Sequence, residues 1–445
     1  MSIFGKYDMR GVYPSDIDED MARDIGRAAA DVLDLGDERV LVGMDVRESS
    51  PSLKRSLVEG LVEGGCKVLD AGTVATPMVY YKVVVDGLPA GFMVSASHNP
   101  KEYNGIKICK ENAKGVTYEN GLGEIEKMVK KYRSGEEEYH SSERGSVTQI
   151  DIKEGFIQRI VSAIDIDEGF KLVIDPGNGS GSMFASRLFQ ELGCEVIEIN
   201  GEPDGGFPNR PPDPDENVQK LKDKVQEKSA DLGVAFDGDA DRALFVDDNG
   251  EKVPNDYILS LFVDSFAEEG DRIVYEIKCS QTLKDVIDSV GAEAIVSRTG
   301  RSYIKSKMLE ENAKIGGELS GHFFFSENDF YDDPFFATGK LLEVIEGKGK
   351  LSELVDRLPK YQSSPEIRLE CRNKEEVVER IKEDFKDRRM DEIDGAKIYF
   401  ENGWALVRSS STEPKLSIRF EADTDEDLAR IKERVMEKVN KYRES

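Results

Sequence analysis

The sequence predicts three similar α/β domains with mixed sheets, followed by a smaller C-terminal α+β domain with an antiparallel sheet. The chain has 445 residues, which is too long for a single hydrophobic core. Apolar runs of strand length alternate with amphipathic helical segments up to about residue 360, a pattern typical of sheets with helices packed on them. Beyond about residue 365, alternating apolar and polar positions and a hairpin pattern indicate an antiparallel sheet.

The first domain is expected to span residues 1–148. Apolar residues at helical spacing predict helices, and short apolar runs predict strands between them. The charged stretch 127–144 is expected to be an exposed connection that ends this domain. In chain order the expected elements are a helix over 21–32, a strand over 39–43, a helix over 53–61 and strands over 66–70 and 90–94.

The three later domains are predicted over residues 149–250, 251–364 and 365–445. In the second domain a strand at 171–175 leads through the glycine-rich loop 176–181 to a helix, and a proline-rich loop at 203–217 is expected on the surface. The glycine-rich loop has neither the Walker A nor the Gly-x-Gly-x-x-Gly pattern, so tight strand-to-helix geometry is preferred over phosphate binding. Further strands are expected at 232–236, 272–277, 294–297, 367–371, 396–400, 404–407 and 416–422, with C-terminal helices at 375–385 and 425–439.

The composition excludes some classes of partner. A formal net charge of −28 at pH 7 argues against nucleic acid and membrane surfaces, since both favour basic proteins. An anionic ligand then requires that basic residues gather at one site while the acidic excess keeps the protein soluble, as in a salty cytoplasm. Five scattered cysteines indicate free thiols in a reducing compartment. No secretory or membrane-spanning segment is recognised, so a cytoplasmic protein is expected.

The first candidate site follows the strand at 90–94. Residues 95–100 read Ser-Ala-Ser-His-Asn-Pro and present Ser97 at a strand end. His98 beside it is a possible proton acceptor, and Lys107 downstream offers a positive charge for a phosphate. Taken alone, the segment is better explained as a hairpin loop with an ordinary serine, and the other motifs change that interpretation.

An acidic loop follows the buried strand at 232–236. Asp237, Asp239 and Asp241 alternate along the chain and are followed by Arg242. On extended backbone the three carboxylates would share one side, which suits the oxygen ligands that Mg²⁺ prefers. An EF-hand is excluded because Arg242 stands where that loop needs glycine and Asp248 where it needs glutamate. A magnesium site is therefore preferred over a solvated turn.

Two more loops carry polar groups. Residues 317–322 offer Glu318 and Ser320 as hydrogen-bond acceptors for vicinal hydroxyls and His322 as a proton-transfer group, although a turn with a core histidine is an alternative. The hairpin loop 408–414 carries Arg408 and several hydroxyls that could grip a phosphate dianion. A merely polar loop is the weaker interpretation because Arg408 lies at the strand end.

With these loops in this order, the sequence resembles the α-D-phosphohexomutase family, most closely its phosphomannomutase/phosphoglucomutase branch. The resemblance rests on four motifs that span the whole chain. Two residues depart from the family pattern: Ser411 stands where asparagine or glycine is common, and Arg301 where histidine is frequent. The motifs are Ser-Ala-Ser-His-Asn-Pro at 95–100, Asp-Gly-Asp-Ala-Asp-Arg at 237–242, Gly-Glu-Leu-Ser-Gly-His at 317–322 and Arg-Ser-Ser-Ser-Thr-Glu-Pro at 408–414.

The resemblance implies four domains around a central cleft and a role for each loop. Ser97 would carry a phosphoryl group, and one Mg²⁺ per chain would be held by a phosphoserine oxygen with Asp237, Asp239 and Asp241. Lys107, His98 or His322 would move the hydroxyl proton. The expected catalytic residues are Ser97, His98, Lys107, Arg242 and His322, and the expected substrate-binding residues are Tyr7, Arg10, Lys278, Arg301, Glu318, Ser320, Arg408, Ser410, Ser411 and Thr412.

The function that follows is a mutase that interconverts hexose 6-phosphate and hexose 1-phosphate, with mannose or glucose as the sugar. A hexose 1,6-bisphosphate is the expected intermediate, with glucose 1,6-bisphosphate or an equivalent as activator. Hexose phosphates are the expected partners, without nucleic acid or membrane, and the protein is expected to be a monomer or homodimer. The alternatives are a phosphoglucosamine mutase, a Mg²⁺-dependent sugar-phosphate phosphatase and a non-catalytic sugar-phosphate sensor.

Overall fold

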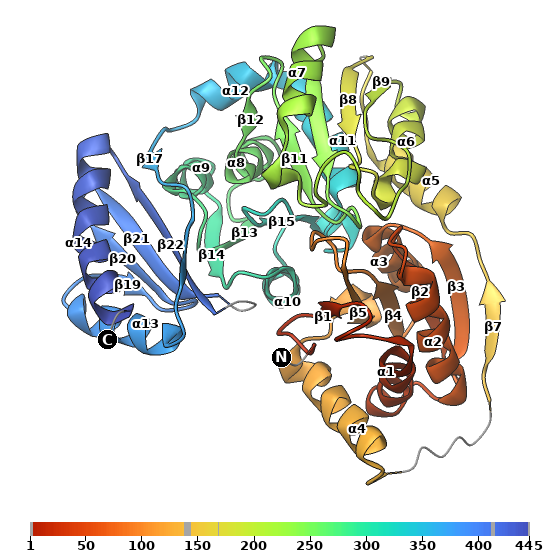
Figure 1. Cartoon of the computed structure of the whole chain (residues 1–445). Coiled ribbons are helices and arrows are strands. Elements are labelled where there is room, and N and C mark those ends of the chain that lie inside the picture. Colours follow the sequence, from red (N-terminus) through yellow and green to blue (C-terminus); the bar gives the residue numbers. More distant parts are fainter. Residues whose placement is uncertain (1–2, 138–143, 168, 411–413, 444–445) are drawn as a thin grey trace. The chain divides into compact units, whose positions relative to one another are not determined.

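The computed structural model describes residues 3–137, 144–167, 169–410 and 414–443 (Figure 1). The fold class is the predicted one, with three α/β sheets followed by an antiparallel sheet. The chain forms two compact units. The first comprises Met1–Asn255 and Ser320–Asp356, and the second comprises Asp256–Leu319 and Arg357–Ser445.

The first sheet is mixed and holds the segment with Ser97. Its central strands β3, β2 and β4 are parallel neighbours, and β5 pairs antiparallel with β4. The sheet follows the order β1-β5-β4-β2-β3-β7, with β6 beside β5. Its elements are β1 (Met9–Val12), α1 (Glu19–Val32), β2 (Arg39–Met44), α2 (Ser50–Glu63), β3 (Lys67–Thr73), α3 (Thr76–Val85), β4 (Ala90–Val94), β5 (Tyr103–Lys110), β6 (Lys114–Gly115), α4 (Gly123–Ser134) and β7 (Ser146–Gln149).

The second sheet, also in the first unit, ends one strand at the acidic loop. Its order is β12-β11-β10-β8-β9; β10 and β9 flank β8 in parallel, and β11 is antiparallel to β10. Phe335 lies 4.6 Å from Phe236 between ring centroids and so ties α11 to this core. Further elements of the first unit, among them β16, which is not a strand of this sheet, are α5 (Lys153–Ala163), β8 (Lys171–Asp175), α6 (Ala185–Glu191), β9 (Glu195–Glu198), α7 (Gln219–Lys228), β10 (Leu232–Phe236), β11 (Ala243–Val246), β12 (Lys252–Val253), β16 (Phe323–Phe325) and α11 (Pro334–Lys348).

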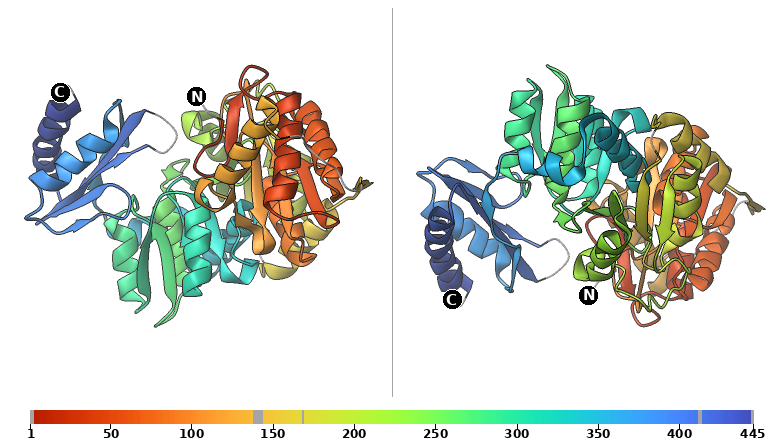
Figure 2. Two further views of the ribbon diagram at one scale, coloured as in Figure 1. Left: turned by 90° about the horizontal axis from the view of Figure 1, so that it is seen from below. Right: turned by 90° about the horizontal axis from the view of Figure 1, so that it is seen from above.

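The second unit holds strands β13, β14 and β15 of the third sheet and the whole of the fourth sheet. β13 pairs in parallel with β14 and β15, whereas all pairs of the fourth sheet are antiparallel. α13 and α14 both pack against β21 and lie on the same face of that sheet (Figures 1 and 2). The elements of this part of the chain, with α8 and α12 at its boundaries, are α8 (Asn255–Phe266), β13 (Arg272–Glu276), α9 (Gln281–Ser289), β14 (Glu293–Ser297), α10 (Arg301–Glu311), β15 (Ile315–Gly317), α12 (Leu351–Arg357), β17 (Gln362–Ser363), β18 (Ile367–Glu370), α13 (Lys374–Asp384), β19 (Met390–Asp391), β20 (Ala396–Phe400), β21 (Gly403–Ser409), β22 (Lys415–Ala422) and α14 (Asp425–Arg443).

Two predicted segments differ from the structure. The charged connection expected from residue 127 begins inside α4, which buries Ile125 and Val129 against the first core. The proline-rich loop 203–217 is not wholly on the surface, because Phe207 and Arg210 are buried. In both segments a few buried side chains lie among many exposed polar ones. The average composition therefore predicted exposure for the whole segment.

The five cysteines are all buried free thiols. Among the helices of the described residues, none combines the length and the apolar character needed to cross a membrane.

Candidate active site

Ser97 lies in the loop that follows β4 and is buried, with 1% of its surface exposed. Its backbone has a φ of 51°, in the left-handed region that residues other than glycine seldom adopt. Ser95 Oγ accepts a hydrogen bond from Ser97 N at 2.8 Å, which helps to fix this conformation. Ser97 Oγ donates to Asp237 Oδ2 at 2.7 Å and lies 3.3 Å from His98 Nδ1. The strand end therefore directs the hydroxyl to the acidic loop.

The three predicted aspartates form one buried cluster. Asp237, Asp239 and Asp241 each offer a carboxylate oxygen, and these oxygens all lie within 4.8 Å of one another. Asp237 Oδ1 accepts hydrogen bonds from the amides of Asp241 and Arg242, so the loop curls around its own first carboxylate. Burial, followed by the charges of Asp241 and Asp239, raises the pKa of Asp237 to about 8.

Lys107 neutralises part of this acidic cluster. Its Nζ contacts Asp239 Oδ2 and lies 2.6 Å from Asp241 Oδ2. Burial opposes the charge on Lys107, yet Asp239 and Asp241 raise the pKa of its ammonium group. Burial likewise opposes ionisation of Asp241, but Lys107 and then His322 hold the pKa of that carboxyl below its usual value.

The cluster fits a divalent cation that prefers oxygen ligands. Asp239 Oδ1 and Asp241 Oδ1 are buried and have no hydrogen-bond partner among the described residues. A buried carboxylate oxygen without a partner is costly, and a bound Mg²⁺ would remove that cost. With Asp237 beside them and Ser97 at hydrogen-bond distance, these oxygens form a suitable set of ligands.

Further basic groups gather beside Ser97. Arg10 on β1 donates from Nη1 to Ala96 O at 3.0 Å and to Asn99 Oδ1, while Asp8 holds its other side. The pKa of His98 lies well below its usual value because of burial and the charges of Arg242, Arg10 and Lys107. A neutral His98 is therefore available as a proton acceptor.

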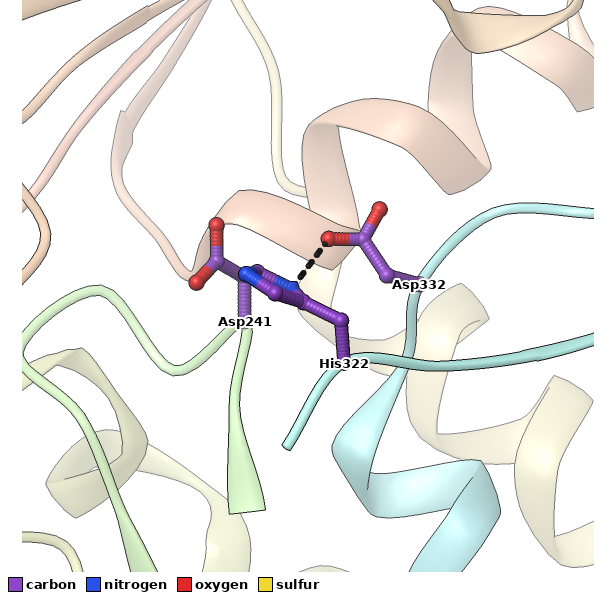
Figure 3. A group of neighbouring side chains, drawn as sticks. All are labelled: Asp241, His322 and Asp332. Atoms are coloured by element: carbon purple, nitrogen blue, oxygen red, sulfur yellow. Dashed lines mark ion pairs between the residues drawn. The ribbon is translucent and has the colours of Figure 1, made fainter. Parts of the chain in front are cut away.

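His322 lies between Asp241 and Asp332 (Figure 3). Its Nδ1 is 2.9 Å from Asp332 Oδ2, and Arg242 Nε donates to its Nε2 at 3.1 Å. Burial disfavours a charged His322, but Asp241 and then Asp332 raise the pKa of its imidazole. Its two ring nitrogens therefore face side chains of opposite charge, Arg242 at Nε2 and Asp332 at Nδ1.

Of the remaining predicted substrate-binding residues, two lie in the first unit and the others in the second. Tyr7 and Ser320, in the first unit, are half-buried. In the second unit Lys278 Nζ lies 3.6 Å from Glu276 Oε2, and Glu318 Oε1 accepts a hydrogen bond from Gly300 N at 2.7 Å.

Arg301 begins α10, and Arg408, near the end of β21, donates from Nε to Asp394 Oδ2 at 3.0 Å. Ser410 N donates to Lys415 O at 2.9 Å. The predicted residues Ser411 and Thr412 lie outside the described residues.

Thr76 and Asp332 contact predicted site residues but were not themselves predicted from the sequence. Thr76, at the start of α3, donates from Oγ1 to Asp239 Oδ2 at 2.5 Å. Asp332 pairs with His322 from a segment that carries no motif of its own. A lone threonine or aspartate gives no local signal, and only the tertiary structure brings each of them to the site.

The fold and these groups form a candidate enzyme site of the kind that phosphoryl transfer requires. A buried hydroxyl, a carboxylate cluster for a divalent cation and three cationic side chains meet in the first unit. Phosphoryl transfer requires such placement of the reacting oxygen and such neutralisation of charge.

Comparison with known proteins agrees with this class of enzyme. Successive segments of the chain match the four domain models of the phosphoglucomutase/phosphomannomutase family. These are the alpha/beta/alpha domains I, II and III, over residues 1–136, 154–250 and 254–361, and the C-terminal domain, over residues 366–438.

Individual relatives match over nearly the whole chain. A phosphomannomutase/phosphoglucomutase of Pseudomonas syringae is 37% identical over 97% of this chain and 93% of its own length. A crystal structure of a family protein from Burkholderia thailandensis has a TM-score of 0.91 at 34% identity, covering 99% of this chain and 98% of that one. A probable phosphoglucosamine mutase of Methanothermobacter thermautotrophicus is 34% identical over 97% of this chain and 96% of its own length. The chain belongs to the phosphoglucomutase/phosphomannomutase family, whose members are isomerases of the phosphohexomutase class.

Proposed function

We propose that this enzyme interconverts hexose 6-phosphate and hexose 1-phosphate, of mannose or glucose, through a phosphoserine at Ser97. The observation that carries the proposal is the 2.7 Å contact between Ser97 Oγ and Asp237 Oδ2, inside a carboxylate cluster suited to Mg²⁺. Residues 1–148, 149–250, 251–364 and 365–445 are proposed as the four domains.

In the first step a free sugar hydroxyl attacks the phosphorus of phosphoserine 97. The new sugar O–P bond forms as the bond between phosphorus and Ser97 Oγ breaks. The hydroxyl proton passes to His98 or His322, since Lys107 already carries its proton. The product is a hexose 1,6-bisphosphate. After it reorients, its other phosphoryl group returns to Ser97 by the reverse exchange, so the protein ends in its starting state.

The protein's own groups would hold the reactants in line and neutralise the charge. Arg10, Lys107 and Arg242 supply positive charge beside Ser97. Asp237, Asp239 and Asp241, with a phosphoserine oxygen, would hold one Mg²⁺, which would supply further charge neutralisation. We propose that Tyr7, Lys278, Arg301, Glu318 and Ser320 bind the sugar, and that Arg408, Ser410, Ser411 and Thr412 bind the phosphate that is not transferred.

The second candidate is a phosphoglucosamine mutase. It is supported by the 34% identity to a relative named a probable phosphoglucosamine mutase, and Ser95 is compatible with that branch. Leu319 in the loop 317–322 and Tyr103 favour mannose or glucose.

Turnover of mannose 1-phosphate, glucose 1-phosphate and glucosamine 1-phosphate, with and without glucose 1,6-bisphosphate as activator, tests these proposals. A mutase yields the 6-phosphates, responds to the activator and releases little inorganic phosphate. Stoichiometric release of phosphate without a need for activator would identify a phosphatase, and binding without turnover would identify a sensor. Light scattering would test the proposed monomer or homodimer, and cell fractionation the proposed cytoplasmic location.

A further inference from the structure

The side chain of Arg47 is completely buried and uses every donor that it has. Arg47 follows β2, and its Nε donates to Asp45 Oδ2 at 3.0 Å. A guanidinium group has five N–H donors in a fixed plane, and the other four donate to backbone carbonyl oxygens of a single segment. These oxygens belong to Ser97 at 2.7 Å, Asn99 at 2.7 Å, Pro100 at 2.8 Å and Tyr103 at 3.0 Å.

Those four carbonyls belong to the segment that presents the nucleophile. Ser97 is held in the left-handed region, and its carbonyl points to Arg47 while its hydroxyl reaches Asp237. The orientation of Arg47 is itself fixed by Asp45, whose Oδ1 also accepts from Ser50 Oγ and from Arg47 N. The backbone of the serine loop is therefore held by one buried charge pair.

Arg210 repeats this arrangement at the acidic loop. Its Nε donates to Asp175 Oδ2 at 2.9 Å, and its Nη2 donates to Asp175 O at 3.0 Å and to Phe236 O at 2.6 Å. Phe236 directly precedes Asp237, so the bond holds the backbone from which the acidic cluster begins. Both members of the pair have side chains that are only 2% exposed.

The two pairs occupy equivalent places in their sheets. Asp45 follows β2, whose parallel neighbour β4 leads to Ser97, and Asp175 ends β8, whose parallel neighbour β10 leads to Asp237. The third sheet, which contains β13 and β15, shows the same relation. Glu276 ends β13 beside its parallel neighbour β15 and accepts a hydrogen bond directly from Leu319 N at 2.7 Å. In each of these three sheets, an acidic residue at the end of one strand holds the loop that follows a parallel neighbouring strand. Asp45 and Asp175 do so through an arginine, and Glu276 does so directly.

The proline-rich loop 203–217 joins the two arginine pairs. It supplies Arg210, and its Phe207 ring lies 5.1 Å from the guanidinium carbon of Arg47. Ser97 O also lies against Gly238, where an added Cβ would be 2.6 Å away. We infer that Arg47 and Arg210 are positioning residues that set Ser97 and the acidic cluster at their working distance, an inference that rests on the proposed function.

Lysine substitutions test this role in the full-length enzyme, because lysine keeps the charge but has three donors on a flexible chain instead of a planar fork. Arg47→Lys is expected to lower kcat about a hundredfold, since small misplacement of a reacting group has effects of this size, with KM changed less than about twofold. Arg210→Lys is expected to weaken Mg²⁺ binding about tenfold, measured by calorimetry on the dephosphorylated protein. Arg47→Lys should leave that Mg²⁺ affinity unchanged.

Leu57→Ala, in the core of the first sheet, is the control for lost stability alone. It should lower the melting temperature and retain both kcat and Mg²⁺ affinity. Lysine variants that behave like Leu57→Ala would overturn the inference.

If either lysine variant fails to fold, Phe207→Leu is the second test, because it removes the ring from Arg47 without unpairing a charge. A fall in kcat at unchanged KM supports the inference, and unchanged kcat rejects it. A wild-type enzyme inactive on every hexose phosphate would reject the proposed function, while the Mg²⁺ measurement on Arg210→Lys would still decide the role of Arg210.

Discussion

Ser97 combines a strained backbone with a hydroxyl that already has an acidic partner. A left-handed conformation in a residue other than glycine costs about 1–3 kcal/mol and persists only where the surroundings hold it. Here Ser95 Oγ, Asp237 Oδ2 and Arg47 fix the amide, the hydroxyl and the carbonyl of the residue in turn. The strain is thus a consequence of aiming one oxygen at the acidic cluster.

Replacing Ser97 by alanine is expected to lower turnover at least about a thousandfold, because no other described group takes the place of its oxygen as phosphoryl acceptor. Turnover with glucose 1,6-bisphosphate present, and transfer of labelled phosphate from the bisphosphate to the protein, are the measurements. Ser186→Ala, on α6, is a matched control that should keep wild-type activity. Undiminished turnover in Ser97→Ala would refute the phosphoserine mechanism.

Replacing Asp239 by alanine is expected to abolish measurable turnover while the fold remains intact. The change removes one carboxylate of the cluster and one of the two acidic partners of Lys107. Calorimetry should show Mg²⁺ affinity lowered at least about tenfold, and circular dichroism should be unchanged. Asp223→Ala, exposed on α7, controls for the loss of one negative charge. Normal activity in Asp239→Ala would reject the metal assignment.

At the scale of elements, the sequence predicted where strands end but not which side chains hold the loops that follow them. β4 and β10 are continuous apolar runs, so the sequence placed Ser97 and Asp237 at strand ends correctly. No local pattern reveals that the carbonyls of the serine loop are held by Arg47, since this contact joins residues 50 positions apart. The same reason explains why Thr76 was missed, since it lies 163 positions from Asp239, whereas Asp332 was missed because its segment carries no motif.

The crossing of α1 and α2 depends on two glycines. A Cβ at Gly60 would lie 2.1 Å from Arg23 O, and one at Gly26 would lie 2.4 Å from Leu57 O. Gly60→Ala is therefore expected to destabilise the protein by about 1–3 kcal/mol through overpacking. Gly347→Ala, at an open position of α11, should instead stabilise by up to about 1 kcal/mol. Urea denaturation of both variants measures the difference, and equal midpoints would contradict the close crossing.

The pairing of β20 with β21 places Lys397 against the single tryptophan of the chain. Lys397 Nζ lies 4.0 Å from the centroid of the Trp404 ring and donates to Ile277 O at 2.9 Å. Burial lowers the pKa of Lys397 to about 8. Deprotonation removes the cation from the indole face, so tryptophan emission is expected to change with a midpoint near pH 8.

The stability of the fold should follow the same titration. The pKa of lysine in the unfolded chain is about 10.4, so between about pH 8 and 10 the unfolded state binds more protons than the folded state. Linkage then makes the free energy of unfolding rise with pH across this window, while the full cost of burying the charge is present below about pH 8. Lys397→Met should abolish both pH dependences. An emission curve that is flat in the wild type would show that this ammonium group does not titrate there.

At the scale of the whole molecule, three cations gather at one place in a chain that is acidic overall. The sequence carries 89 acidic and 61 basic residues, yet Arg10, Lys107 and Arg242 all act on His98 beside Ser97. Three cations thus lie together beside Ser97, where Asp237, Asp239 and Asp241 lie as well. Composition set such a gathering of basic residues as a condition for an anionic ligand, and the three segments that supply these cations lie far apart in sequence.

The acidic excess is expected to make stability rise with salt. A net charge of −28 repels itself in the folded state, and the Debye length falls from about 10 Å at 0.1 M to about 3 Å at 1 M salt. Screening also weakens ion pairs such as Lys127 with Glu124 and Arg380 with Glu376, but exposed pairs of this kind contribute little each. Because acidic groups outnumber basic ones, the relief of repulsion should outweigh the loss of pairs. The melting temperature should therefore increase between 0.05 M and 1 M KCl, and more than in sucrose of equal osmolality, which does not screen charge. A melting temperature that falls with KCl would mean that ion pairs, and not repulsion, dominate the electrostatic stability of the fold.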